Sequence, residues 1–96
     1  MILEHALLSI KPGQAAAFEA AMARAKPLIA ASPGFRSIAV RKACESTDLY
    51  LLLVEWDDIA SHRDGFRTSM RYQEWRTLLH PFYDPMPVVG YFGAPL

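Results

Sequence analysis

The sequence has few of the features that usually mark metal, redox or nucleotide chemistry. Cys44 is its only cysteine, so no disulfide can form within the chain, and this usage suits a reducing cytoplasm. The sequence contains no CxxC or HxxxH pair, which disfavours a metal site. It also has no GxGxxG, phosphate-loop or GxSxG motif, so dinucleotide-binding, nucleotide-binding and serine-hydrolase functions are not expected.

Net charge and long apolar runs are lacking as well. Ten Lys and Arg balance ten Asp and Glu, so no long-range field attracts nucleic acid or an anionic membrane. No apolar run approaches the ~20 residues needed to cross a bilayer. The opening MILEHALLSI has no basic region and carries Glu4 and His5, so it is a poor signal peptide. We expect a cytoplasmic protein that binds neither nucleic acid nor membrane.

The order of predicted elements defines a fold class. A chain of 96 residues predicts one domain over 1–96. Hydrophobic periodicity predicts strands at 2–10, 35–43, 49–56 and 88–92, and helices at 14–31, 59–67 and 70–80. We expect Pro27 to kink the first helix or end it early. The βαββαβ order predicts an α+β, ferredoxin-like fold, with an antiparallel sheet and its helices on one face.

The strand LYLLLVEW at 49–56 is apolar on both faces. Side chains alternate along a strand, so Tyr50, Leu52, Val54 and Trp56 point one way and three leucines point the other. The chain's own helices can cover one face only. Burying each Leu is worth roughly 1.5–3 kcal/mol, so we expect a second copy of the chain to cover the other face. The predicted assembly is a homodimer.

His62 is the first candidate for chemistry. Ile59 and Phe66 share its helical face, which is the apolar one. A histidine in an apolar space can titrate near neutrality and act as a general base or hydrogen-bond donor. The alternative is a buried histidine bonded to a backbone carbonyl, because buried polar groups are usually satisfied. Asp58 is four residues earlier, where its carboxylate could pair with the imidazole or, as we expect, cap the helix.

Other candidates lie around the same helices. Trp56 could form the wall of a pocket for a flat ligand, or be a core tryptophan. Tyr72 has the spacing of a core residue, and Arg76 could reach an anionic ligand or extend to water. The arginines that recur every fourth residue indicate a solvated face, since acids lie nearby; they are Arg63, Arg67 and Arg71.

Four stretches together resemble the antibiotic biosynthesis monooxygenase family of dimeric α+β barrels. They are IKPGQAAAFEAA after the opening strand, SPGF at 32–35, LVEWDDIASH at 53–62 and FRTSMRYQEWRTLLHPFYDPMPVV at 66–89. The resemblance covers nearly the whole chain. It implies a ferredoxin-like monomer whose sheet joins that of its twin, and a ligand cavity between sheet and helices.

The resemblance also implies a chemistry. In the polyketide-tailoring members the enzyme helps a polycyclic phenol lose a proton, and the anion reacts with O₂ without metal or flavin. The resemblance places Trp56 on the family's tryptophan, His62 facing the cavity and Arg76 near a functional arginine. Leu52 stands where some members carry an asparagine. A sister branch degrades haem with an Asn-Trp-His set, but this chain has no Asn, so haem is not expected.

Two classes of function follow. The first is a cofactor-independent monooxygenase that uses O₂ on a small aromatic or quinol-type substrate, with His62 and Arg76 as catalytic residues. Its predicted substrate contacts are Trp56, Tyr72, Phe66 and Leu52. The second is a non-catalytic dimeric module that binds a small hydrophobic ligand. An isomerase on the same fold would use the same base without consuming O₂.

Overall fold

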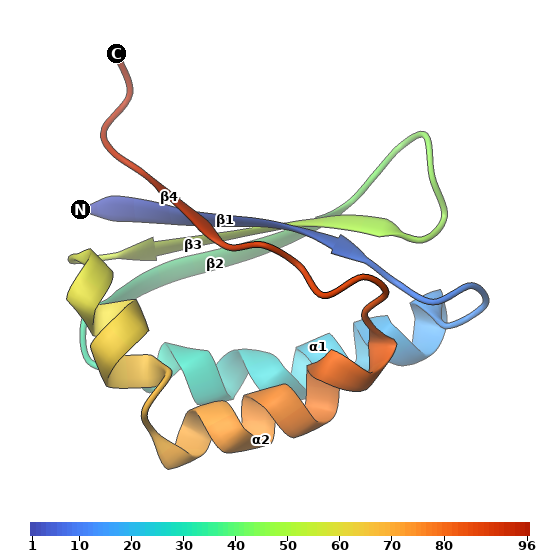
Figure 1. Cartoon of the computed structure of the whole chain (residues 1–96), viewed down its shortest axis with the longest axis horizontal. Helices are drawn as coiled ribbons and strands as arrows, with labels where there is room; N and C mark the ends of the chain where they lie inside the picture. Colours follow the sequence, from blue (N-terminus) through green and yellow to red (C-terminus); the bar gives the residue numbers. More distant parts are fainter.

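The four strands form one antiparallel sheet. The computed structural model describes all 96 residues. Its strands are β1 (Ile2–Ser9), β2 (Phe35–Lys42), β3 (Leu49–Trp56) and β4 (Gly90–Phe92), in the spatial order β2-β3-β1-β4. The strand order and the chain order confirm the predicted ferredoxin-like pattern (Figure 1). The bounds of β3 agree with the prediction, whereas the last strand begins at Gly90 rather than at 88.

Two helices lie side by side against one face of this sheet. They are α1 (Ala15–Ala30) and α2 (Met70–Leu79), which occupy the same side in Figure 1. The apolar stripe of α1 supplies Phe18, Met22 and Ile29 to the core, as its spacing predicts. The helix does not end at Pro27 but continues to Ala30, because Ala25 and Ile29 anchor its last turns in the core. Neither α1, with 16 residues, nor the shorter α2 could span a lipid bilayer.

The predicted helix at 59–67 contains a wider turn than expected. Residues Ser61–Phe66 form a π-helix, η1, in which the Arg67 amide donates to the His62 carbonyl at 3.0 Å. Such turns are uncommon and often occur at functional sites. Both His62 and Phe66 are buried there, so the shared apolar face is confirmed. Asp58 caps this segment as predicted: Oδ1 accepts from the Ser61 amide at 2.7 Å.

A glycine lets this turn approach the sheet. Gly34 precedes β2 with φ of 84°, a conformation that favours glycine. A Cβ at Gly34 would lie 2.2 Å from Ser61 Oγ, so no larger residue fits without displacing η1. The glycine of the SPGF motif therefore allows the helix that carries His62 to pack closely beside the sheet.

The two faces of the sheet differ in cover. The inward side chains of β3 are buried; they are Tyr50, Leu52, Val54 and Trp56. The outward leucines of β3 are only half-buried, and Leu51 lies opposite Leu7 of β1, which is 52% exposed. Phe92 of β4, which is 55% exposed, lies beyond β1, opposite Leu3. The chain leaves this outer face without a cover of its own.

Candidate functional site

A cavity lies between the inner face of the sheet and the helices. Its volume is about 320 Å³. Much of its wall is apolar and comes from Ala6 and Leu8 of β1, Leu52 of β3, Ile29 of α1 and Phe66 of η1. The loop after Tyr83, which contains a cis Asp84–Pro85 peptide, closes one side. The size and lining suit a small ligand of one or two rings.

The structure brings five of the six predicted site residues to this cavity. They are His62, Arg76, Tyr72, Phe66 and Leu52. Trp56 lies outside the lining. Its side chain is fully buried between Phe35 and His62, and its indole Nε1 donates to Glu4 Oε1 at 2.9 Å. Trp56 therefore does not face the cavity, but its hydrogen bond holds Glu4 in the cavity wall.

Glu4 is the central polar group of the site. It projects from β1 into the cavity wall and is only 3% exposed. Glu4 Oε1 accepts from the Trp56 indole and also lies 3.5 Å from His62 Nε2. The other ring nitrogen, His62 Nδ1, lies 2.6 Å from the Tyr91 hydroxyl of β4. Trp56 and Glu4 thus form one hydrogen-bonded pair and His62 and Tyr91 another, and the 3.5 Å contact between Glu4 and His62 brings the two pairs together.

Burial favours the neutral form of both titratable partners. It raises the pKa of Glu4 from 4.5 to about 6, although the Trp56 bond and the Arg67 charge oppose the shift. Burial lowers the pKa of His62 to about 4, and the Arg67 charge adds to this effect. At neutral pH the imidazole is therefore uncharged while Glu4 is ionised. The ionised carboxylate 3.5 Å from Nε2 favours the tautomer that carries its proton on Nε2, which leaves Nδ1 to accept from the Tyr91 hydroxyl.

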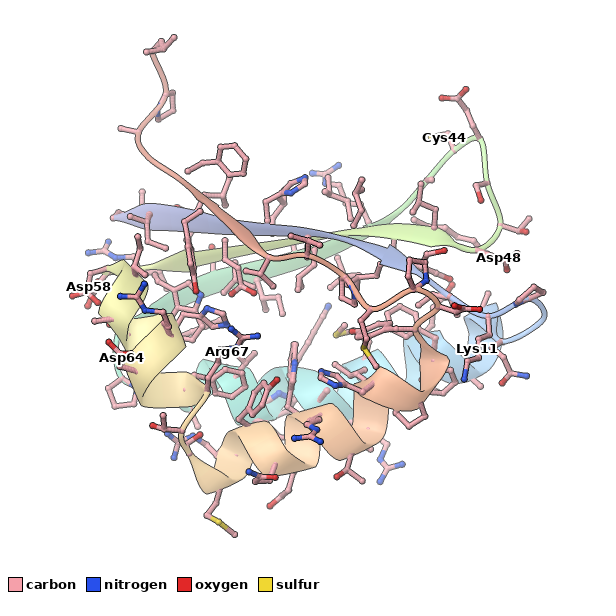
Figure 2. The ribbon with its side chains drawn as sticks, viewed as in Figure 1. Lys11, Cys44, Asp48, Asp58, Asp64 and Arg67 are labelled. Carbon is pink, nitrogen blue, oxygen red and sulfur yellow. The ribbon has the colours of Figure 1, made fainter.

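Two arginines and a histidine also line the cavity. They are Arg67, which follows η1, Arg76 of α2, and His80 at the end of α2. Figure 2 shows Arg67 extending toward the space between the sheet and α2, while Asp64 points to the outer side of η1. The predicted solvated face holds for Arg63 and Arg67, which are both exposed, whereas Arg71 is half-buried; Arg67 also lines the cavity.

Sequence reasoning missed Glu4, Arg67 and Tyr91. A signal for Glu4 was present: it is the one charged residue of the first strand and shares its inward face with Ala6, Leu8 and Ile10. A carboxylate at a core position is rarely left unpaired. No group of three or more His, Cys, Asp or Glu side chains is placed to hold a metal ion.

A ferredoxin-like sheet with helices on one face and a ligand-sized cavity between them defines the class of protein. A family model described as antibiotic biosynthesis monooxygenase matches residues 1–78. The uncharacterized protein YczJ of Bacillus subtilis strain 168 is 46% identical over 92 residues, which cover 96% of this chain and 97% of that protein. The chain therefore belongs to the antibiotic biosynthesis monooxygenase family.

Solved structures agree with this assignment. A proposed antibiotic biosynthesis monooxygenase from Bordetella bronchiseptica matches with a TM-score of 0.94 and 34% identity, over 99% of this chain and 97% of that one. SnoaB from Streptomyces nogalater, described as a cofactor-independent oxygenase, matches with a TM-score of 0.86 over 99% of this chain and 93% of that one. SnoaB is 20% identical to this chain, so its likeness shows the fold alone.

Proposed function

We propose that this protein is a cofactor-independent monooxygenase that uses O₂ on a small aromatic, quinol-type substrate. The observation that carries the proposal is Glu4, a buried carboxylate in the wall of a largely apolar cavity. A carboxylate in such a place is poised to accept a proton from a bound phenol or enol. Membership of the family and the printed description of SnoaB support oxygen chemistry without a cofactor.

The reaction needs only the substrate and O₂. Glu4 accepts the hydroxyl proton, and the anion that remains is electron-rich enough to reduce O₂ directly. One oxygen atom forms a carbonyl at a ring carbon that carries one hydrogen in the enol form, and the other oxygen leaves as water with that hydrogen and the proton returned by Glu4. The substrate supplies all the electrons, so no external reductant enters. The apolar wall excludes water and strengthens every charge interaction inside the cavity.

The geometry distributes the roles differently from the sequence-based prediction. Both ring nitrogens of His62 are engaged, one with Tyr91 and one near Glu4. We therefore propose His62 as the donor that orients the Glu4 carboxylate, supported by Tyr91, and Trp56 as its second orienting donor. Arg76 adds positive charge that stabilises the substrate anion. The proposed substrate contacts are Tyr72, Phe66 and Leu52.

We also propose a homodimer that covers the outer face of the sheet. The half-buried leucines of β3 and the exposed Leu7 and Phe92 place apolar side chains on the same face of three adjacent strands. A second copy would remove this surface from water. The cavity lies on the opposite face, so dimerisation leaves it free for a ligand.

The engaged state of His62 favours a second candidate, a binding module that holds a small hydrophobic ligand without chemistry. Purified protein in an oxygen electrode, given a panel of quinols and anthrone-like phenols, distinguishes the two. The proposal predicts that one O₂ is consumed for each molecule of at least one substrate, well above the rate without protein. Ligand binding with no oxygen uptake across the panel would instead establish the binding module. Exchange of substrate hydrogen with deuterated solvent, again without oxygen uptake, would indicate an isomerase.

A further inference from the structure

Two arginines that line the cavity form no ion pair with an acidic side chain. Arg67 and Arg76 both line it, and no carboxylate oxygen lies within 4.0 Å of either guanidinium. Asp64, the acid nearest to Arg67 in the sequence, lies 3.7 Å from Arg63 and points away from the cavity (Figure 2). Both arginines are exposed to solvent where they line the cavity, so their guanidinium groups are free to bind a ligand there.

The basic groups lie around one aromatic side chain. The Arg67 guanidinium lies 6.0 Å from the centre of the Tyr72 ring, and that ring lies 6.2 Å from the ring of His80. Arg76 follows Tyr72 by one turn of α2, on the same face. Burial lowers the pKa of His80, and the charges of Arg76 and Arg67 lower it further, so both guanidiniums lie close enough to repel a proton there. We call Arg67, Arg76 and His80 the basic rim.

Charge balance indicates what the rim accepts. At neutral pH the charged groups of the lining are Glu4, which is negative, and Arg67 and Arg76, which are positive, while the two histidines are neutral. The lining therefore carries one excess positive charge. A bound ligand with a single negative charge restores neutrality. A doubly charged group such as a phosphate dianion would overcompensate. Arginine presents paired N–H donors that match the two oxygens of a carboxylate.

We propose that the substrate carries a carboxylate, which Arg67 binds with the support of Arg76, while its phenol or enol hydroxyl faces Glu4. This inference rests on the proposed function for the role of Glu4, and it deepens that function by naming the substrate as a small hydroxyaromatic acid. Arg67 fixes the orientation of the ring because it binds one end while Glu4 binds the other. Arginine-rich rims of this kind select a ligand by charge as well as by shape.

A matched pair of ligands separates charge recognition from shape. The pair is 6-hydroxy-2-naphthoate and its neutral carboxamide, titrated anaerobically into the protein by calorimetry at low ionic strength. Because charge-assisted hydrogen bonds add affinity, the carboxylate should bind about tenfold more tightly than the amide. The variant Arg67→Gln should lose most of that preference while its affinity for the amide stays unchanged. Arg63→Gln, which alters an exposed arginine of the same turn, is the control and should keep the preference.

A second readout comes from His80. A carboxylate bound beside the two arginines offsets their repulsion, so the pKa of His80 should rise when 6-hydroxy-2-naphthoate binds and not when the amide binds. The inference would be overturned if the two ligands bound with equal affinity or if the carboxylate did not bind. It would also be overturned if Arg67→Gln weakened the binding of carboxylate and amide equally. None of these results bears on oxygen uptake with neutral quinols, which tests the proposed function separately.

Discussion

Replacing Glu4 with Gln should lower kcat/KM for oxygen consumption by about 10²–10⁴-fold, the usual contribution of a positioned general base. The substitution keeps the size of the side chain and an oxygen that can accept from the Trp56 indole. It removes the negative charge and with it the ability to take a proton. Affinity for a substrate-like ligand should change little, so the loss should fall on kcat. An oxygen electrode with the quinol that the wild type oxidises fastest gives the measurement.

The stability of the same variant shows whether the loss is chemical or structural. The pKa of Glu4 is raised to about 6 in the folded protein from its ordinary 4.5, so the native state holds this proton more tightly than the unfolded chain. Stability therefore falls as pH rises from 4.5 to about 6, and above that window the ionised carboxylate costs about 2 kcal/mol. Glu4→Gln should thus unfold at higher denaturant concentration than the wild type at pH 7.5, despite being inactive.

A matched control is Glu74→Gln, which makes the same chemical change on the exposed side of α2. It should leave both oxygen uptake and unfolding unchanged. Full activity in Glu4→Gln would remove Glu4 from the mechanism. Lost activity together with lower stability at pH 7.5 would mean that Glu4 is a structural residue.

Placing a lysine at Leu51 should convert the protein from dimer to monomer. Leu51 lies on the outer face of β3, between Leu7 of β1 and Arg41 of β2 in register, so the new ammonium would find no acidic partner opposite it. Burying an uncompensated charge costs roughly 3–5 kcal/mol, which corresponds to a rise of about 10³-fold in the dimer dissociation constant. Sedimentation at micromolar concentration should show a dimer for the wild type and a monomer for Leu51→Lys.

The apolar variant Leu51→Met controls for packing and should remain a dimer. Near-native circular dichroism in Leu51→Lys would show that the monomer keeps its fold, since the inner face of the sheet carries the core. A wild type that sediments as a monomer would show that the protein does not dimerise. A Leu51→Lys variant that stays dimeric would show that another surface forms the interface.

The sheet and helices were predictable because their patterns are regular. The two-faced strand at 49–56 forms with the predicted bounds, since alternating burial dictates the direction of every side chain. The π-turn of η1 was not predictable, because a helix with one inserted residue keeps the same apolar side chains at nearly the same spacing. Arg67 keeps the solvent exposure that the stripe of arginines predicts, but it also lines the cavity, which the sequence pattern does not indicate.

The site was predictable only in part. The sequence alone marks His62 as a candidate because it is a titratable residue on an apolar helix face. It marks Arg76 because a cation near such a face could reach an anionic ligand. Glu4 and Tyr91 lie at opposite ends of the chain and come together only because β4 pairs with β1, which sets Glu4 opposite Tyr91 in register. Trp56 looked like a pocket wall, yet strand register turns it toward Glu4 and the core instead.

The dependence of kcat/KM on pH tests the role of Glu4 most directly. The groups that face its carboxylate are the Trp56 indole, the neutral His62 and the Arg67 charge. The account predicts a constant rate above about pH 7 and a tenfold fall per pH unit below about 6, because the carboxylate must be ionised to accept a proton. A rate that continues to rise from pH 7 to 9, following ionisation of the substrate hydroxyl alone, would contradict it.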